Sequence, residues 1–203
     1  MHIVCTDLEG VLVPEIWINV SMKTGIDELK LTTRDISDYD VLMKRRLEIL
    51  KENNLKLHDI QYVISTLKPF PGARDLMHWL RQRMQIIIVS DTFTEFAGPL
   101  MRQLDFPTIF CNDLITDETG GITGYRLRQK DGKRKVAEAL QALNYKVIGV
   151  GDSYNDISML RQSDDGILYN PPENVRKENE DLRMVKTYGE LRELIGSITE
   201  YKY

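Results

Sequence analysis

Two carboxylates, Asp7 and Glu9, follow a short apolar run at residues 3–6 and are themselves followed by Gly10. Such a run, rich in β-branched residues and ended by polar residues and glycine, predicts a strand buried on both faces. In open α/β sheets, binding sites lie just beyond the carboxyl ends of such strands. A glycine here lets the backbone approach a bound anion without interference from a Cβ. Taken alone, the segment has a simpler interpretation as an acidic strand-to-loop junction, so its chemistry depends on partners elsewhere in the chain.

A second pair of carboxylates, Asp152 and Asp156, follows the apolar run at residues 147–150. Carboxylates that converge from separate strand ends form an oxygen-rich, negatively charged site, which suits Mg²⁺ with several retained waters. After a third apolar run, at residues 86–89, Ser90 supplies a hydroxyl that can donate to a phosphate oxygen. Alone, Ser90 would be interpreted as a helix cap and Asp152 as part of a chance acidic turn. Three such segments in order at strand ends favour a phosphate site.

The elements that must position these segments alternate along the chain. Apolar runs predict strands, and apolar residues at helical spacing predict helices, so the order favours a doubly wound, Rossmann-like parallel sheet of the α/β class. The predicted strands are residues 3–6, 86–89, 108–111, 147–150, 166–169 and 182–185, with a hairpin around residues 119–121. The predicted helices have their apolar positions within residues 73–80, 93–104, 136–143 and 191–198.

Residues 14–68 interrupt this alternation and are predicted to form a small helical cap domain. Apolar residues recur at helical spacing from Tyr39 to Leu50 and from Ile60 to Leu67. Because the segment begins and ends next to the first pair of carboxylates, it would lie over the strand ends. The predicted catalytic core then consists of residues 1–13 and 69–203.

Arg46 stands out in the predicted cap because it lies on the face of its helix that should be apolar, three residues after Met43 and four after Leu42. A buried charge is costly unless it meets an anion or a carboxylate. Two structural interpretations stay open, a salt bridge with Glu15 and a side chain that extends to solvent. The functional interpretation is a contact with an anionic group of a substrate. Trp17 is interpreted as core or cap packing.

Composition limits the classes of function. The 203 residues carry 27 basic and 31 acidic side chains, a formal net charge of −4, which argues against a nucleic-acid binder with a basic surface. Two cysteines indicate neither a disulfide framework nor a Cys-rich zinc site. No apolar stretch approaches the roughly 20 residues of a membrane span, and no signal-like leader precedes the first predicted strand. We therefore expect a cytoplasmic protein without membrane or nucleic-acid partners, of undetermined oligomeric state.

The segment Asp7-Leu8-Glu9-Gly10-Val11 resembles the first motif of the haloacid dehalogenase-like phosphatases, Asp-x-Asp-x-(Thr/Val), with glutamate in place of the second aspartate. Ser90 matches the second motif, a Ser or Thr after an apolar strand, and the stretch from Gly151 to Asp156 matches the fourth, Gly-Asp-x-x-x-Asp. Within the family, the chain is similar to the phosphoserine phosphatase branch. Its Asp-x-Glu variant, together with Ser-Asp-Thr at the second motif, most resembles the bifunctional phosphoserine phosphatase/homoserine phosphotransferases. Asp91 departs from the Ser-Gly-Gly of that branch, so its role stays open.

This resemblance implies a Mg²⁺-dependent enzyme that hydrolyses phosphoserine through an aspartyl phosphate, with phosphoryl transfer to homoserine as a second activity. Asp7 would be the nucleophile and Glu9 the general acid and base. The implied phosphate-binding residues are Gly10, Ser90 and Lys133, and the implied substrate-binding residues are Glu15, Arg46, Asp91 and Asn155. The implied metal ligands are Asp7, Glu9 through its main-chain carbonyl, and Asp152, with Asp156 behind them.

The resemblance also selects one lysine among three neighbours. The stretch from Lys133 to Glu138 aligns with the Lys-Gly-Glu-Ile-Leu-Glu of the family, which favours Lys133 over Lys130 and Lys135; otherwise each is a solvated charge at a helix end. Three other functions stay open: a phosphatase of another small metabolite phosphate, a receiver-like signalling protein, and a non-catalytic phosphate-binding regulator. A receiver carries its acceptor aspartate on a middle strand in chain order, whereas Asp7 follows the first.

Overall fold

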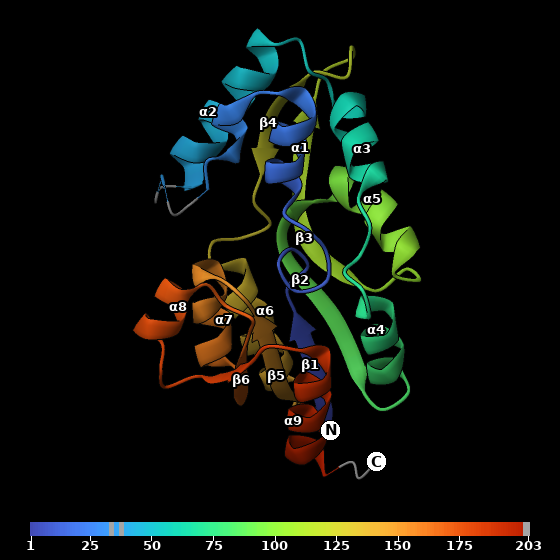
Figure 1. The fold of residues 1–203 in the computed structure, drawn as a ribbon, viewed down its shortest axis with the longest axis vertical. Helices are drawn as coiled ribbons and strands as arrows, with labels where there is room; N and C mark the ends of the chain where they lie inside the picture. Colours follow the sequence, from blue (N-terminus) through green and yellow to red (C-terminus); the bar gives the residue numbers. More distant parts are fainter. Residues whose placement is uncertain (33–34, 37–38, 201–203) are drawn as a thin grey trace.

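The structure, a computed structural model, describes residues 1–32, 35–36 and 39–200 (Figure 1). Seven strands form one sheet in the order β4-β3-β2-β1-β5-β6-β7. The strands are β1 (His2–Thr6), β2 (Gln85–Phe93), β3 (Ile109–Thr116), β4 (Ile122–Arg126), β5 (Lys146–Gly151), β6 (Asp165–Tyr169) and β7 (Arg183–Val185). Neighbouring strands are parallel except β3 and β4, which form the expected hairpin. The predicted α/β class is therefore confirmed.

Helices cover both faces of the sheet, and the strand residues alternate between them. Val4 of β1 packs in the cluster that includes α4 and α9, whereas its neighbours Ile3 and Cys5 pack in the cluster that includes α6, α7 and α8. This burial on both faces explains why the strand reads as a continuous apolar run. The helices are α4 (Ala73–Arg81), α5 (Thr94–Gln103), α6 (Gly132–Ala142), α7 (Ile157–Gln162), α8 (Glu173–Glu178) and α9 (Tyr188–Thr199).

The helical segment between β1 and α4 lies at the end of the molecule opposite the termini (Figure 1). It contains α1 (Ile16–Thr24), a 3₁₀ turn η1 (Asp27–Lys30), α2 (Tyr39–Glu52) and α3 (Leu57–Thr66). Here α2 packs on β4, and α3 packs on α5. Leu29, Met43 and Ile49 belong to the same buried cluster as residues of the sheet. The division into a core and a cap of residues 14–68 stays a prediction.

The second strand differs from its predicted length. The run at residues 86–89 was expected to end before Ser90, but β2 continues through Ser90, Asp91 and Thr92 to Phe93. Its pairing with β3 has an irregular register between Val89 and Phe93, so the polar residues occupy a distorted part of the strand. The prediction missed this because long-range pairing with β3 stabilises an extended backbone where the local sequence suggests a strand end. None of the helices in the described ranges combines the length and apolarity that a membrane span requires.

Candidate active site

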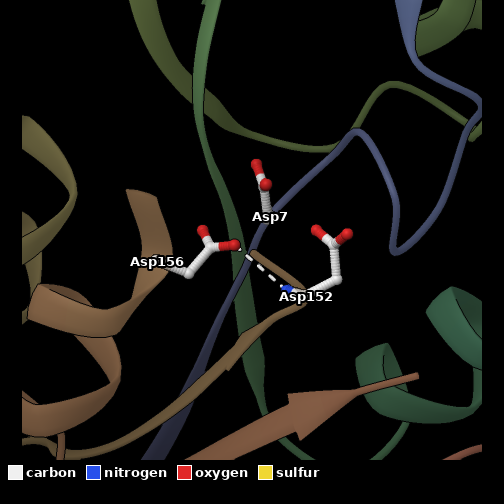
Figure 2. Close-up of side chains that lie close together, drawn as sticks. All are labelled: Asp7, Asp152 and Asp156. Carbon is white, nitrogen blue, oxygen red and sulfur yellow. Dashed lines mark hydrogen bonds between the residues drawn. The ribbon is translucent and has the colours of Figure 1, made fainter. Parts of the chain in front are cut away.

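Asp7, Asp152 and Asp156 meet at the carboxyl ends of the central strands β1 and β5 (Figure 2). β1 pairs with β5 in parallel along its whole length, so the residues that follow the two strands are neighbours. All three side chains are buried, and each contributes a carboxylate oxygen to a group whose members lie within 4.8 Å of one another. The two acidic segments found in the sequence therefore form one site.

Lys133, near the start of α6, is the lysine that reaches this group. Its Nζ lies 2.7 Å from Oδ1 of Asp156, 2.9 Å from Oδ1 of Asp7 and 3.8 Å from Oδ2 of Asp91, and only 3% of the side chain is exposed. Burial lowers the pKa of Lys133, but the charges of Asp156, Asp7 and Asp91 outweigh this effect and raise it well above its usual range. Lys130 is exposed, and Lys135 pairs with Glu138.

Asp156 is held by hydrogen bonds at both of its carboxylate oxygens. Oδ1 accepts from Lys133, while Oδ2 accepts from the backbone N–H groups of Asp152 (3.0 Å) and Ser153 (3.1 Å). A Cβ at Gly151 would collide with the Asp156 side chain, so glycine is required for this approach. Asp156 therefore holds Lys133 and the backbone at Asp152, while its role next to metal ligands stays a prediction.

The donor set of this group fits a hard divalent cation. Three carboxylates and one ammonium leave an excess of negative charge, and carboxylate oxygens are the ligands that Mg²⁺ prefers. Burial, and then the charge of Asp156, raise the pKa of Asp7 well above its usual range, against the opposing effect of Lys133. A cation between the carboxylates would counteract this repulsion. The backbone of Gly10 also approaches the Asp152 carboxylate closely: Gly10 has φ +77°, and a Cβ there would overlap that carboxylate.

Glu9 contacts the start of the helical insertion. Its Oε2 accepts a hydrogen bond of 2.7 Å from the backbone N–H of Ile16, at the start of α1. The side chain thus joins the end of β1 to the helical insertion. Burial, and then the charge of Glu15, raise the pKa of Glu9 to about 8. Glu9 therefore holds a proton near neutral pH, whereas its predicted role as a metal ligand through the main-chain carbonyl stays a prediction.

Of the three aspartates, Asp7 lines a cavity of 220 Å³. Eight of the residues predicted for the site line it: Asp7, Glu9, Glu15, Arg46, Ser90, Asp91, Lys133 and Asn155. The salt bridge between Arg46 and Glu15, one of the two structural interpretations left open by the sequence, is not formed. Arg46 has no ion pair with any carboxylate in the described ranges; it is only 7% exposed, and its Nη2 donates to Leu31 O at 2.8 Å. Burial lowers the pKa of Arg46 to about 10, so the side chain stays charged at neutral pH.

Asp91 and Asn155 connect the second and fourth motifs across the cavity. Nδ2 of Asn155 donates to Oδ2 of Asp91 at 2.8 Å, and Ser90 Oγ accepts from the backbone N–H of Thr92 at 3.2 Å. Both Asp91 and Asn155 also border a neighbouring cavity of 630 Å³. The smaller cavity is the candidate active site, because Asp7, Glu9 and Arg46 line it and do not line the larger one.

Two aromatic residues of the site were assigned to packing alone. Tyr39, the first residue of α2, donates from its hydroxyl to Asp91 O at 3.5 Å and lines the cavity. Trp17, on α1, lies under the guanidinium of Arg46, with its ring centroid 4.6 Å from Arg46 Cζ. Helical spacing predicts which face of a helix is buried, but it does not predict which residues of other elements contact that face. The one available signal was the charge of Arg46 on an apolar stripe.

Comparison with known proteins agrees with this geometry. The family model for haloacid dehalogenase-like hydrolases matches residues 1–164. The chain belongs to the haloacid dehalogenase-like hydrolase family. It is 58% identical over 192 residues to the phosphoserine phosphatase of Pseudomonas syringae pathovar tomato; the matched region covers 95% of this chain and 81% of that protein. It is also 58% identical over 192 residues to the phosphoserine phosphatase ThrH of Pseudomonas aeruginosa; here the matched region covers 95% of this chain and 94% of the relative.

Solved structures show that the fold of this hydrolase is shared with distant relatives. A phospho-aspartyl intermediate analogue of a phosphoserine phosphatase superposes with a TM-score of 0.78 at 21% identity, covering 97% of this chain and 98% of that one. A substrate-bound phosphoserine phosphatase complex gives a TM-score of 0.75 at 18% identity, covering 97% of each chain. Both structures thus share the fold of this chain, although most of the sequence differs.

Proposed function

We propose that this hydrolase is a phosphoserine phosphatase that works through an aspartyl phosphate on Asp7. The observation that carries the proposal is that one cavity holds two sets of groups. Asp7 and Lys133 form a buried phosphate site, and Arg46 and Glu15 supply a cation and an anion for a zwitterionic amino acid. The relatives at 58% identity, both phosphoserine phosphatases by name, support the same substrate.

The first step forms the intermediate. A carboxylate oxygen of Asp7 attacks phosphorus, the bond from phosphorus to the serine oxygen breaks, and Glu9 donates its proton to the departing oxygen. The raised pKa of Glu9, about 8, suits this acid role because the proton is present at neutral pH. Lys133 and the Ser90 hydroxyl donate to the phosphoryl oxygens and stabilise the charge that develops there.

The second step releases the phosphoryl group. The carboxylate of Glu9 takes a proton from water, the water oxygen attacks phosphorus, and the bond between Asp7 and phosphorus breaks. A homoserine hydroxyl in the place of this water would give homoserine phosphate. The Asp-x-Glu variant of the first motif and Ser90-Asp91-Thr92 support this second activity, because both resemble the bifunctional branch of the family.

We further propose Mg²⁺ as the cofactor, held by Asp7, Asp152 and the main-chain carbonyl of Glu9. Asp156 would support these ligands without binding the ion itself. When bound, the ion would neutralise charge on the phosphoryl group and on the nucleophile. Asp156 would act through its hydrogen bonds, because Lys133 and two backbone N–H groups already occupy its oxygens. The helices of residues 14–68 would then form a cap that supplies Glu15 and Arg46.

A phosphatase assay over several substrates tests the proposal. We expect Mg²⁺-dependent phosphate release from phosphoserine, with slower release from phosphothreonine and little from sugar phosphates. The same reactions with free homoserine, followed by ³¹P NMR, should show homoserine phosphate as a second product. Faster turnover of a sugar phosphate would favour a phosphatase of another metabolite, and no turnover of any substrate would favour a non-catalytic protein.

A further inference from the structure

Arg46 is buried, and no carboxylate in the part of the chain that the structure describes forms an ion pair with it. Its Nη2 donates to Leu31 O at 2.8 Å, and its Nη1 makes a weak contact of 3.6 Å with the sulfur of Met43. Its Nε is buried, and none of the described residues accepts a hydrogen bond from it. The positive charge of this guanidinium and its unused N–H donors are therefore available to bind an anion that enters the cavity.

Trp17 supplies the contact that stabilises this cation. The guanidinium lies over the indole ring at 4.6 Å from its centroid, within the range of a cation–π interaction. Such an interaction attracts the cation through the face of the ring but adds no opposite charge and uses none of the in-plane N–H donors. A carboxylate in the same place would also stabilise Arg46, but it would compete with an anionic ligand.

The position of Trp17 is itself fixed by the core. Its ring meets Phe96 of α5 edge to face, with centroids 5.7 Å apart, and Phe96 meets Phe93 of β2 in the same way at 5.6 Å. Phe93 and Phe96 are both 1% exposed, so they are held by close packing. Through these contacts, the indole ring is held in a defined position relative to the strand that carries Ser90 and Asp91.

We infer that Trp17 is a positioning residue that keeps Arg46 charged, unpaired and directed into the cavity, and so selects phosphomonoesters whose alcohol part carries a carboxylate. This inference rests on the proposed function and extends it, because it assigns the choice of substrate to an aromatic residue outside the family motifs. Trp17 acts through Arg46 and does not take part in the chemistry of phosphoryl transfer.

The test compares phosphoserine with phosphoethanolamine, which has the same phosphate and ammonium groups but no carboxylate. For Trp17→Leu, we expect KM for phosphoserine to rise by about 2- to 30-fold, the range of a cation–π contact, with little change in kcat. Both constants for phosphoethanolamine should stay near the wild-type values. Trp17→Phe keeps an aromatic face and should recover part of the preference. Trp79→Leu is the matched control, because Trp79 of α4 has the guanidinium of Arg83 at 4.7 Å from its ring centroid and lies outside the cavity lining.

The outcomes separate this inference from the proposed function. If the wild-type enzyme does not prefer phosphoserine to phosphoethanolamine, the proposed substrate is wrong. If it does and Trp17→Leu keeps the same ratio of kcat/KM values, Trp17 has no part in the preference and the inference is overturned. Equal losses on both substrates in Trp17→Leu and Trp17→Phe also overturn it, because they would mean that the ring only supports the fold.

Discussion

The ammonium of Lys133 lies 2.9 Å from the carboxylate of Asp7, deep in the protein, where only 3% and 5% of the two side chains are exposed. Lys133 also contacts Asp156 at 2.7 Å, so one cation connects the first motif to the fourth. This position lets the same side chain orient the nucleophile and donate to a transferring phosphoryl group.

Replacing Lys133 should therefore remove most of the activity. Lys133→Met leaves the carboxylates without their cation and removes a donor to the phosphoryl group, so we expect kcat to fall by about 10²- to 10³-fold or more. Lys133→Arg should not restore it, since the planar guanidinium does not fit a site shaped for a compact ammonium. Lys135→Met, two residues along the same helix, should keep wild-type kcat; a similar loss there would indicate a general effect on α6.

Asp156 should control cation affinity more than chemistry. Asp156→Ala removes the acceptor for the backbone N–H groups of Asp152 and Ser153, so the Asp152 carboxylate loses its fixed position. Loss of such a supporting contact commonly weakens metal binding by about 10- to 100-fold. The Mg²⁺ dependence of phosphate release and calorimetric titration should both show this shift, and Asp181→Ala on the surface should not. An unchanged Mg²⁺ affinity would place the cation away from Asp152.

Arg46→Ala should raise KM for phosphoserine by about 10- to 150-fold, the equivalent of a charge-assisted contact worth ~1.5 to 3 kcal/mol. The rate with p-nitrophenyl phosphate should change far less, because that substrate has no carboxylate. Arg45→Ala is the neighbouring control, since Arg45 pairs with Glu28 and Glu48 on the surface. Equal losses with both substrates in Arg46→Ala would mean that Arg46 is a structural residue.

Glu9 is the departure from the family pattern that we expect to influence the choice of acceptor. Its carboxylate is placed by the N–H of Ile16 at 2.7 Å, a contact that a shorter aspartate would not reach from the same backbone position. Glu9→Asp should keep measurable hydrolysis while the ratio of homoserine phosphate to free phosphate falls. Glu9→Gln should lower both products by roughly 10²- to 10⁴-fold. An unchanged ratio in Glu9→Asp would make Asp91 the next residue to test.

Much of the fold follows from local patterns in the sequence. Continuous apolar runs predicted β1, β5 and β6, because strands covered on both faces bury every side chain. The carboxyl-end rule then placed Asp7 next to Asp152 without any coordinates. The extension of β2 through Ser90 and Asp91 did not follow, because pairing with a distant strand decides it. The short helix α8 was missed because its six residues give too little periodicity.

Contacts between elements account for what the sequence did not predict at the site. The hydrogen bond between Asp91 and Asn155 joins residues 64 positions apart, and neither residue type indicates the other as its partner. The stacking of Trp17 on Arg46 joins two helices in the same way. The charge of Arg46 on an apolar face indicated that some contact was needed, but the pattern did not distinguish a substrate from the two structural interpretations, a salt bridge with Glu15 and exposure to solvent.

Covalent catalysis by Asp7 is the central claim, and labelling of the intermediate tests it most directly. Wild-type enzyme mixed with ³²P-phosphoserine and quenched in acid should retain label as an acyl phosphate, and peptide mapping should place it on Asp7. Asp7→Asn should fold normally, take up no label and show no turnover, because an amide cannot form the acyl phosphate. Label on another residue, or continued turnover in Asp7→Asn, would contradict the account.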